Sequence, residues 1–290
     1  MATVNDNYPK NNATELTDEQ LKELALQNYK QQEVYKNKFP TEVIGLPSKG
    51  ILYDATSPLA SGQIEMKYMT AREEDILTSA NLIKQGIVLD KLFQSMIISP
   101  VNYNDIIIGD KNAIMIAARI LGYGKDYECS VTCPMCERGS PHTIDLTSVP
   151  TKEVTLDGPS KMIAPNKFEF ILPQSKRVIV FRLLTHGLDS AIEKKLEAAK
   201  KSARKDSVDN ELTTRLKHLI LSVDGDSEQS YINHFVDNEL FAMDSKALRA
   251  QIKDIAPDQS FTFNFECPHC GHEEDGLSFP VTTQFFWPGT

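Results

Sequence analysis

The chain has 290 residues, and its 41% hydrophobic content is enough to bury at least one sizeable core. Its 40 acidic residues outnumber its 31 basic residues, so the formal charge is −9 and the average surface repels nucleic acid. The sequence lacks an apolar run of about 20 residues and an N-terminal signal peptide. We therefore expect a soluble product that is made in the cytoplasm, with no membrane segment.

Residues 1–40 are predicted to form a polar tail followed by a helical arm. Thr17 and Gln20 have the spacing of a capping box, which predicts a helix that runs to Lys38, before Pro40. The apolar stripe of this helix is thin. Two interpretations stay open: the helix docks on a partner, or it lies on its own domain.

Residues 41–125 are predicted to form a helical lobe. Thr70 and Glu73 have capping-box spacing, and Asp110 is expected to cap the helix that follows it. The predicted elements are a strand at 63–69 and helices at 70–86, 89–97 and 110–122.

From Tyr127 onward the apolar pattern changes to a period of two. Residues 126–150 and 258–290 each read as strand, cysteine turn and strand. The segment 151–257 between them is predicted to be an insertion with a β-hairpin at "KFEFILPQSKRVIVFRLL" and helices at 189–205, 211–223, 229–241 and 245–255. The expected fold is α+β, with helical lobes around a two-hairpin, four-cysteine zinc ribbon.

The two cysteine turns carry the strongest chemical signal. "CPMC" and "CPHC" place Cys133, Cys136, Cys267 and Cys270 in two C-x-x-C pairs, separated by 267 − 136 − 1 = 130 residues. Two such turns on hairpins match the tetrahedral thiolate site of structural Zn²⁺. Gly271 is expected to adopt positive φ in the second turn.

Three neighbouring side chains need separate interpretations. Cys129 does not fit the ligand spacing, so we interpret it as a core thiol. His269 and His272 are candidates to replace a cysteine ligand, although such histidines more commonly shield the sulfurs or face solvent.

Two further segments are candidate partner surfaces. Lys194, Lys201 and Lys205 fall near one face of the helix predicted at 189–205, where they would suit an acidic partner or a phosphate backbone. The alternative is an ordinary solvated helix face. At the other end of the chain, the aromatic residues either close the core of the ribbon or insert into a neighbouring subunit: Phe285, Phe286 and Trp287.

Motifs of catalysis are absent from the sequence: it has no Gly-rich phosphate loop, no G-x-S-x-G and no H-E-x-x-H. Asp224 and Asp226 are interpreted as a turn, and His186 as a structural histidine. We therefore expect neither an enzyme nor a small-molecule substrate.

Several long phrases resemble the baseplate hub and hub assembly proteins of T-even-type contractile-tailed bacteriophages. They include "LPSKGILYDATSPLASGQIEMKYMTAREEDILTSANLI", "AARILGYGKDYE", "LTTRLKHLILSVDGD" and "FFWP", and the resemblance extends over residues 39–288. It implies a structural part of the virion tail baseplate that joins the hub, the tape-measure protein and the start of the tail tube. No catalytic residues come with this resemblance.

Two other classes of function remain alternatives. One is an assembly chaperone that is absent from the finished particle. The other is a zinc-ribbon regulator that binds nucleic acid through the basic helix, with an affinity that falls steeply as salt is added.

Overall fold

The computed structural model describes residues 40–202, 210–281 and 285–287. Contacts divide the chain into two units, Met1–Pro40 and Thr41–Thr290. The helix predicted at 17–38 and the side chain of Lys205 lie outside the described residues. All of the described residues except Pro40 belong to the second unit.

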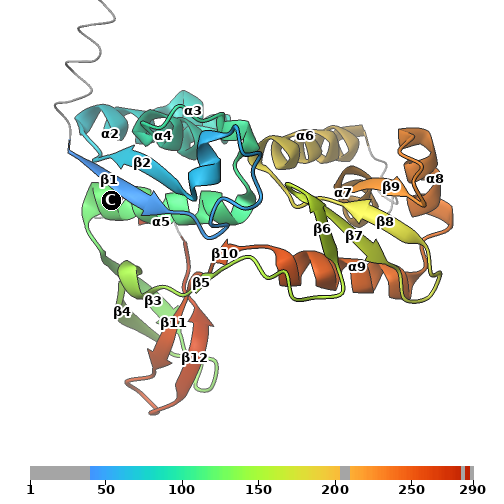
Figure 1. The fold of residues 1–290 in the computed structure, drawn as a ribbon. Helices are drawn as coiled ribbons and strands as arrows, with labels where there is room; N and C mark the ends of the chain where they lie inside the picture. The colour runs from blue at the N-terminus through green and yellow to red at the C-terminus, as the bar shows by residue number, and fades with distance from the viewer. Residues whose placement is uncertain (1–39, 203–209, 282–284, 288–290) are drawn as a thin grey trace, which may run out of the picture. The chain divides into compact units, whose positions relative to one another are not determined.

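The first part of this unit combines one hairpin with helices (Figure 1). Strand β1 (Thr41–Gly45) pairs antiparallel with β2 (Gln63–Lys67). The helical elements that accompany the hairpin are η1 (Pro58–Ser61), α2 (Ala71–Leu77), α3 (Ala80–Lys84), α4 (Val88–Met96), η2 (Tyr103–Asp105) and α5 (Ile108–Tyr123). None of the helices that the structure describes is both long enough and apolar enough to cross a membrane.

The capping box before α2 is confirmed, but the long helix predicted after it is wrong. Glu73 accepts hydrogen bonds from the backbone N–H and the hydroxyl of Thr70 at 3.0 and 2.6 Å. The helix then stops after Leu77, where the Thr78 hydroxyl donates back to the carbonyl of Glu74. Ser79 is extended and starts α3, since Ser and Thr side chains compete with the helix for backbone groups.

Asp110 is not the cap of α5, which begins two residues earlier. Its buried carboxylate instead accepts hydrogen bonds from the backbone N–H of Ser48, at 2.9 Å, and from the hydroxyl of Tyr53. The first turn of α5 therefore holds the preceding loop, and the N–H of Ile108 donates to the carbonyl of Leu184. The sequence did not reveal this role because both partners of Asp110 lie more than 50 positions away.

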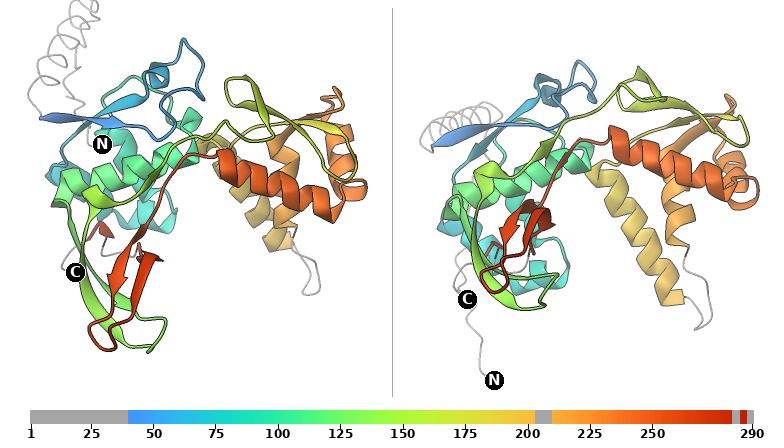
Figure 2. Two further views of the ribbon diagram at one scale, coloured as in Figure 1. Left: turned by 60° about the horizontal axis from the view of Figure 1, so that its bottom comes forward. Right: turned by 90° about the horizontal axis from the view of Figure 1, so that it is seen from below.

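Four strands form the two predicted cysteine hairpins, which lie side by side in Figures 1 and 2. Strand β3 (Asp126–Thr132) pairs with β4 (Gly139–Asp145), and β11 (Thr262–Glu266) pairs with β12 (Glu273–Ser278). Both pairs are antiparallel, so the prediction of strand, turn and strand is confirmed twice.

The segment between the hairpins folds as a four-stranded antiparallel sheet with helices. The sheet order is β6 (Lys161–Ala164), β7 (Lys167–Ile171), β8 (Val178–Phe181) and β9 (Ile220–Val223). The helices are α6 (His186–Ser202), α7 (Glu211–Leu219), α8 (Gln229–Asn238) and α9 (Ala242–Ile255). Short elements at the edges of the segment are η3 (Leu146–Ser148), β5 (Thr151–Lys152) and β10 (Asp258–Gln259).

The prediction of a helix at 211–223 is wrong for the last four residues. The chain leaves the helix at Leu219, and Ile220–Val223 pairs with β8 as strand β9. The apolar run cannot distinguish a helix from a strand by itself, and here the open edge of β8 decides in favour of the strand.

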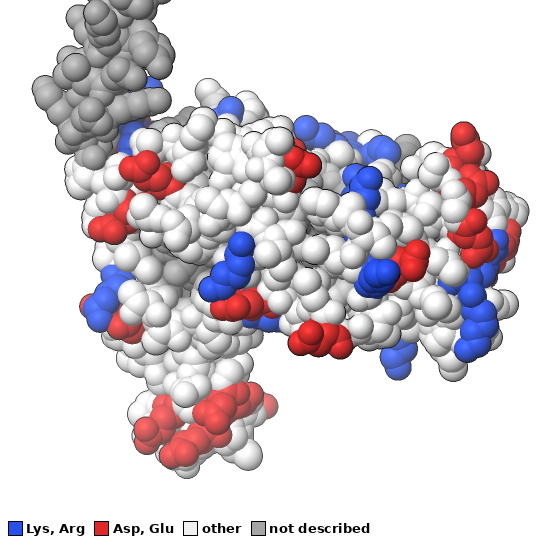
Figure 3. All heavy atoms as spheres, viewed as in Figure 1, with Lys and Arg blue, Asp and Glu red and all other residues white. Residues whose placement is uncertain are grey.

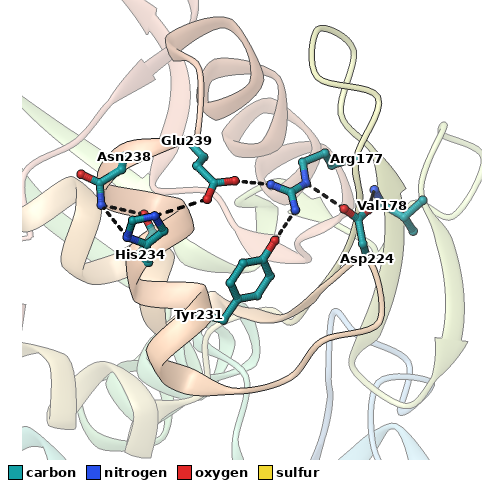
Figure 4. Close-up of polar contacts among 7 residues, drawn as sticks. All are labelled: Arg177, Val178, Asp224, Tyr231, His234, Asn238 and Glu239. Atoms are coloured by element: carbon teal, nitrogen blue, oxygen red, sulfur yellow. Dashed lines mark hydrogen bonds and ion pairs between the residues drawn. The ribbon is translucent and has the colours of Figure 1, made fainter.

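Arg177 connects three parts of this segment (Figure 4). Its guanidinium donates to Asp224 at 2.7 Å, in the turn after β9, and also to Tyr231 and Glu239, on and just after α8. It also lies over the ring of Phe235 at 5.1 Å. The positive charge thus fixes the α8 region against the turn that follows β9, and the turn interpretation of Asp224 agrees with its φ of 50°.

The two ends of the segment between the hairpins are paired with each other. Thr151 lies opposite Gln259, and Lys152 lies opposite Asp258. The segment therefore leaves and rejoins the hairpin region through one short antiparallel ladder. Its division into separate lobes stays a prediction, because the hydrophobic cluster is continuous through helices, sheet and hairpins.

Candidate metal centre

The two cysteine turns are built with the same backbone hydrogen bonds. In the first, the N–H of Cys133 donates to the carbonyl of Arg138, and the N–H of Glu137 donates back to Cys133. In the second, Cys267 donates to the carbonyl of His272, and Gly271 donates back to Cys267. Each pair of cysteines therefore lies at the tip of its hairpin in an equivalent position.

Each turn needs one residue with positive φ. Gly271 has φ of 69°, which confirms the expectation from the sequence. The corresponding residue of the first turn is Glu137, with φ of 58°. Sequence reasoning missed this residue, because a glutamate gives no signal of left-handed backbone.

The four sulfur atoms converge between the hairpin tips. All four lie within 4.8 Å of one another, and the pairs Cys133–Cys270 and Cys136–Cys267 are each separated by 3.7 Å. Four sulfurs at about 2.3 Å from a central zinc form a tetrahedron with edges of roughly 3.8 Å. The donor set therefore fits a tetrahedral metal ion.

Backbone N–H groups lie close to the sulfurs, and the pKa values of Cys267 and Cys270 are shifted in opposite directions. The N–H of Met135 donates to the sulfur of Cys133 at 3.4 Å. Burial by itself raises the pKa of Cys267. The N–H groups of His269 and Cys270 and the adjacent thiols lower this pKa by more than burial raises it, so the result is about 6. The N–H of His272 lowers the pKa of Cys270, yet burial and the neighbouring cysteines raise it to about 12. Neighbouring thiolates repel each other, and a bound divalent cation would offset that repulsion.

The other candidate ligands lie outside the sulfur cluster. The ring of His272 faces Glu274, with 3.4 Å between Nε2 and Oε2, and His269 is exposed. Cys129 is buried in β3, and burial raises its pKa. Within the described residues, the group that could hold a metal therefore consists of the four cysteines alone.

Aromatic contacts join the two hairpins away from their tips. His142 of β4 packs between Phe263 and Phe265 of β11, with ring centroids at 5.6 and 4.9 Å. At the base, Tyr127 contacts Phe279 and donates its hydroxyl to the carbonyl of Pro280 at 2.8 Å. The sequence pattern placed these rings on strands but did not indicate which strands would meet.

The C-terminal aromatics lie in the core of this chain. Phe285 and Phe286 are 0% and 1% exposed, and they contact Tyr127 and Phe93 respectively. The indole N–H of Trp287 donates to the carbonyl of Leu77 at 3.2 Å. This burial favours the interpretation in which Phe285 and Phe286 close the core of the chain, while a role of the three C-terminal aromatics in partner binding stays a prediction.

Two of the three lysines predicted to bind a partner, Lys194 and Lys201, lie on α6. Lys194 and Lys201 are exposed, on the side of the helix opposite the buried Ile192 and Leu196. A role of these lysines in partner binding stays a prediction. His186, at the start of the same helix, is buried beside Lys111 and Asp90, with 3.0 Å between its Nδ1 and the lysine Nζ.

The fold and the site together define a mixed α+β protein with four cysteines arranged to enclose a metal ion. Such a site leaves no open coordination position for a substrate. The chain belongs to the T4 bacteriophage base plate protein family, whose model matches residues 51–287. No curated protein and no solved structure matches the chain.

Membership of this family supports a structural role in the baseplate of the virion tail, with other phage tail proteins as partners. It also favours a non-enzymatic function. The expectation of a baseplate protein is therefore confirmed at the level of the family.

Proposed function

We propose that the chain is a component of the central hub of the baseplate, made in the host cytoplasm and joining hub, tape-measure and tube-initiation parts during tail assembly. The family match over residues 51–287 supports the baseplate role. The assignment to the hub depends on the long phrases that resemble hub proteins, such as the stretch from Leu46 to Ile83.

Counting copies in purified particles tests this proposal. Quantitative mass spectrometry would compare the chain with known hub and peripheral baseplate proteins in particles and in infected-cell lysate. A small fixed number of copies per tail, with crosslinks to hub or tape-measure proteins, is the expected result. Abundance in the lysate without any copies in the particle would instead identify a transient assembly chaperone, and crosslinks only to peripheral proteins would exclude the hub.

The charge of the second cysteine hairpin disfavours nucleic-acid binding at that hairpin, so the alternative depends on the basic helix α6 for its contact. Glu266, Glu273 and Asp275 are exposed on the second hairpin, and its strands and turn contain no Lys or Arg. A zinc ribbon with this surface repels phosphates.

We also propose that the four cysteines bind one Zn²⁺ as a structural ion. The separation of 3.7 Å between sulfurs of different hairpins supports this proposal. The ion would link residues on either side of a long segment, and its binding free energy would be expressed largely as stability.

Removing one ligand tests the zinc proposal. Cys133→Ala and Cys270→Ala are expected to lose stoichiometric zinc and to lower the Tm by more than about 5 °C. Cys129→Ala is the matched control, since this buried thiol lies outside the sulfur cluster and should leave the zinc content unchanged. Ligand variants that lack zinc but melt at the wild-type temperature would show that the site does not stabilise the fold.

A further inference from the structure

The outer face of α6 is basic because another helix neutralises its acidic residues. Arg215 of α7 forms ion pairs with Asp189, at 3.0 Å, and with Glu193. Lys194, Lys200 and Lys201 are exposed and form no ion pair with a carboxylate among the residues that the structure describes. Glu197 is the one acidic residue left on the exposed part of this helix. Considering the described residues alone, α6 therefore presents a surplus of positive charge that no ion pair balances.

The second cysteine hairpin has the opposite character. Glu266 lies directly opposite Glu273 in the ladder, and Asp275 follows on the same strand. Figure 3 shows acidic side chains gathered over the end of the hairpins. Like charges directly opposite each other destabilise an antiparallel pair, so this arrangement weakens the hairpin unless a positive group approaches it from outside.

The cysteine site increases this negative charge. Four thiolates around one divalent ion leave two negative charges at the same hairpin tip. Because the whole chain carries −9, copies repel each other on average, and a local positive surface that meets an acidic one would offset this repulsion.

We propose that the acidic hairpin β11–β12 of one copy docks on the basic face of α6 of a second copy. Lys194 and Lys201 lie two helical turns apart, about 10 Å along the axis. Alternate residues of a strand, such as Glu273 and Asp275, are about 7 Å apart on one side, and flexible lysine side chains can span the difference.

A contact between two different surfaces of the same chain is head-to-tail. It generates a ring if the rotation between copies closes, and an open chain of subunits if it does not. The inference goes beyond the proposed hub function and concerns only how copies of this chain meet.

Charge reversal on each surface, in the full chain, tests the proposal. The hairpin variant carries Glu273→Lys and Asp275→Lys, and the helix variant carries Lys194→Glu and Lys201→Glu. Both sets of positions are exposed. Lys161→Glu with Lys167→Glu is the matched control, because these exposed lysines lie on β6 and β7. Circular dichroism and zinc content would verify that each variant is folded.

Sedimentation equilibrium in low and high salt gives the readout. The wild-type chain is expected to self-associate, with affinity at least about tenfold weaker at 500 mM than at 50 mM salt. Each variant alone should lose this association by a similar factor, and an equimolar mixture of the two should regain it, because each reversed surface then meets its complement.

A wild-type chain that stays monomeric at about 100 μM in 50 mM salt overturns the proposal. It is also overturned if both reversals leave self-association unchanged, or if they weaken binding only to a different tail protein. None of these results changes the number of copies counted per particle, so failure here is separate from failure of the hub assignment.

Discussion

Glu73 shows how one buried carboxylate stabilises the start of a helix. Its side chain is 0% exposed and accepts hydrogen bonds from Thr70, from the hydroxyl of Ser95 at 2.6 Å and from the ammonium of Lys67 at 2.8 Å. Burial by itself raises the pKa of this carboxyl. The hydrogen-bond donors, of which Lys67 has the largest effect, lower the pKa by more than burial raises it, so the result is about 2. The charged form is thus the stable form in the folded chain.

This carboxylate should make stability depend on pH in acid. Because the folded pKa, about 2, is below the ordinary value of 4.5, the ionised group stabilises the fold above pH 4.5. The contribution is about 3 kcal/mol and is lost as the pH falls from 4.5 to 2. Urea unfolding of Glu73→Gln should show this deficit at pH 7 and a shrinking difference from wild type below pH 4.5. Asp75→Asn, on the exposed side of the same helix, should show no such trend.

For single residues, the sequence predicts hydrogen-bond partners that are close together in the chain and misses partners that are far apart in it. Thr70 and Glu73 are three positions apart, so their capping box is visible in the sequence. Asp110 was expected to cap a helix for the same local reason, but its partners are Ser48 and Tyr53. The choice between a local and a distant partner depends on tertiary packing.

Among the elements, the two cysteine turns offer a comparison within one chain. They share their hydrogen bonds, but the residue with positive φ is Glu137 in one and Gly271 in the other. A side chain in left-handed backbone costs about 1–2 kcal/mol, while glycine costs roughly 0.5–1 kcal/mol in chain entropy. The first turn is therefore the more strained.

Substitutions at these positions should act in opposite directions. Glu137→Gly is expected to stabilise the protein by about 0.5 kcal/mol, and Gly271→Ala to destabilise it by about 1 kcal/mol. An added Cβ at Gly271 meets no atom within 4 Å, so the effect comes from the backbone alone. Gly139→Ala is the control, since this glycine lacks positive φ. Effects of the same sign in urea unfolding would refute this account.

Strands and helices were predictable where the pattern was long and bounded by turns. The hairpins β3–β4, β11–β12 and β7–β8 follow directly from alternating apolar residues on either side of a turn. Strand β9 was missed because "ILSV" continues the apolar run of α7 without a break. Its state is set by pairing with β8, which no local pattern encodes.

In the whole molecule, the C-terminal aromatics connect the hairpins to the first helices. Phe286 lies between Phe285 and the ring of Phe93 on α4, and Phe285 contacts Tyr127 on β3. Three segments far apart in the sequence thus share one cluster of rings.

Removing one of these rings should destabilise the entire unit. Phe286→Ala is expected to cost about 3–5 kcal/mol, because the ring is buried and its loss leaves a cavity. Phe241→Ala, at a site that is 50% exposed, should cost much less. Thermal unfolding would measure both. Equal stability of the two variants would instead favour a role of the C-terminal aromatics in partner binding.

The identity of the four cysteines as a set was predictable, but the way the chain brings them together was not. The C-x-x-C spacing and the turns were sufficient to nominate Cys133, Cys136, Cys267 and Cys270. The pairing of β5 with β10 and the packing of His142 against Phe263 were not visible, since each depends on strands from opposite ends of the intervening segment.

The separation of the cysteine pairs has a consequence for synthesis. Cys267 follows Cys136 by 267 − 136 = 131 positions, so at about 5–20 residues per second the ribosome adds it roughly seven to twenty-six seconds later. During that interval the first pair has only two thiolates and cannot enclose an ion. The site can close only on a chain that has been translated through Cys270. A product truncated before Cys267 keeps only the first pair of cysteines, so its two thiols stay exposed in an open half-site and distinguish it chemically from the finished protein.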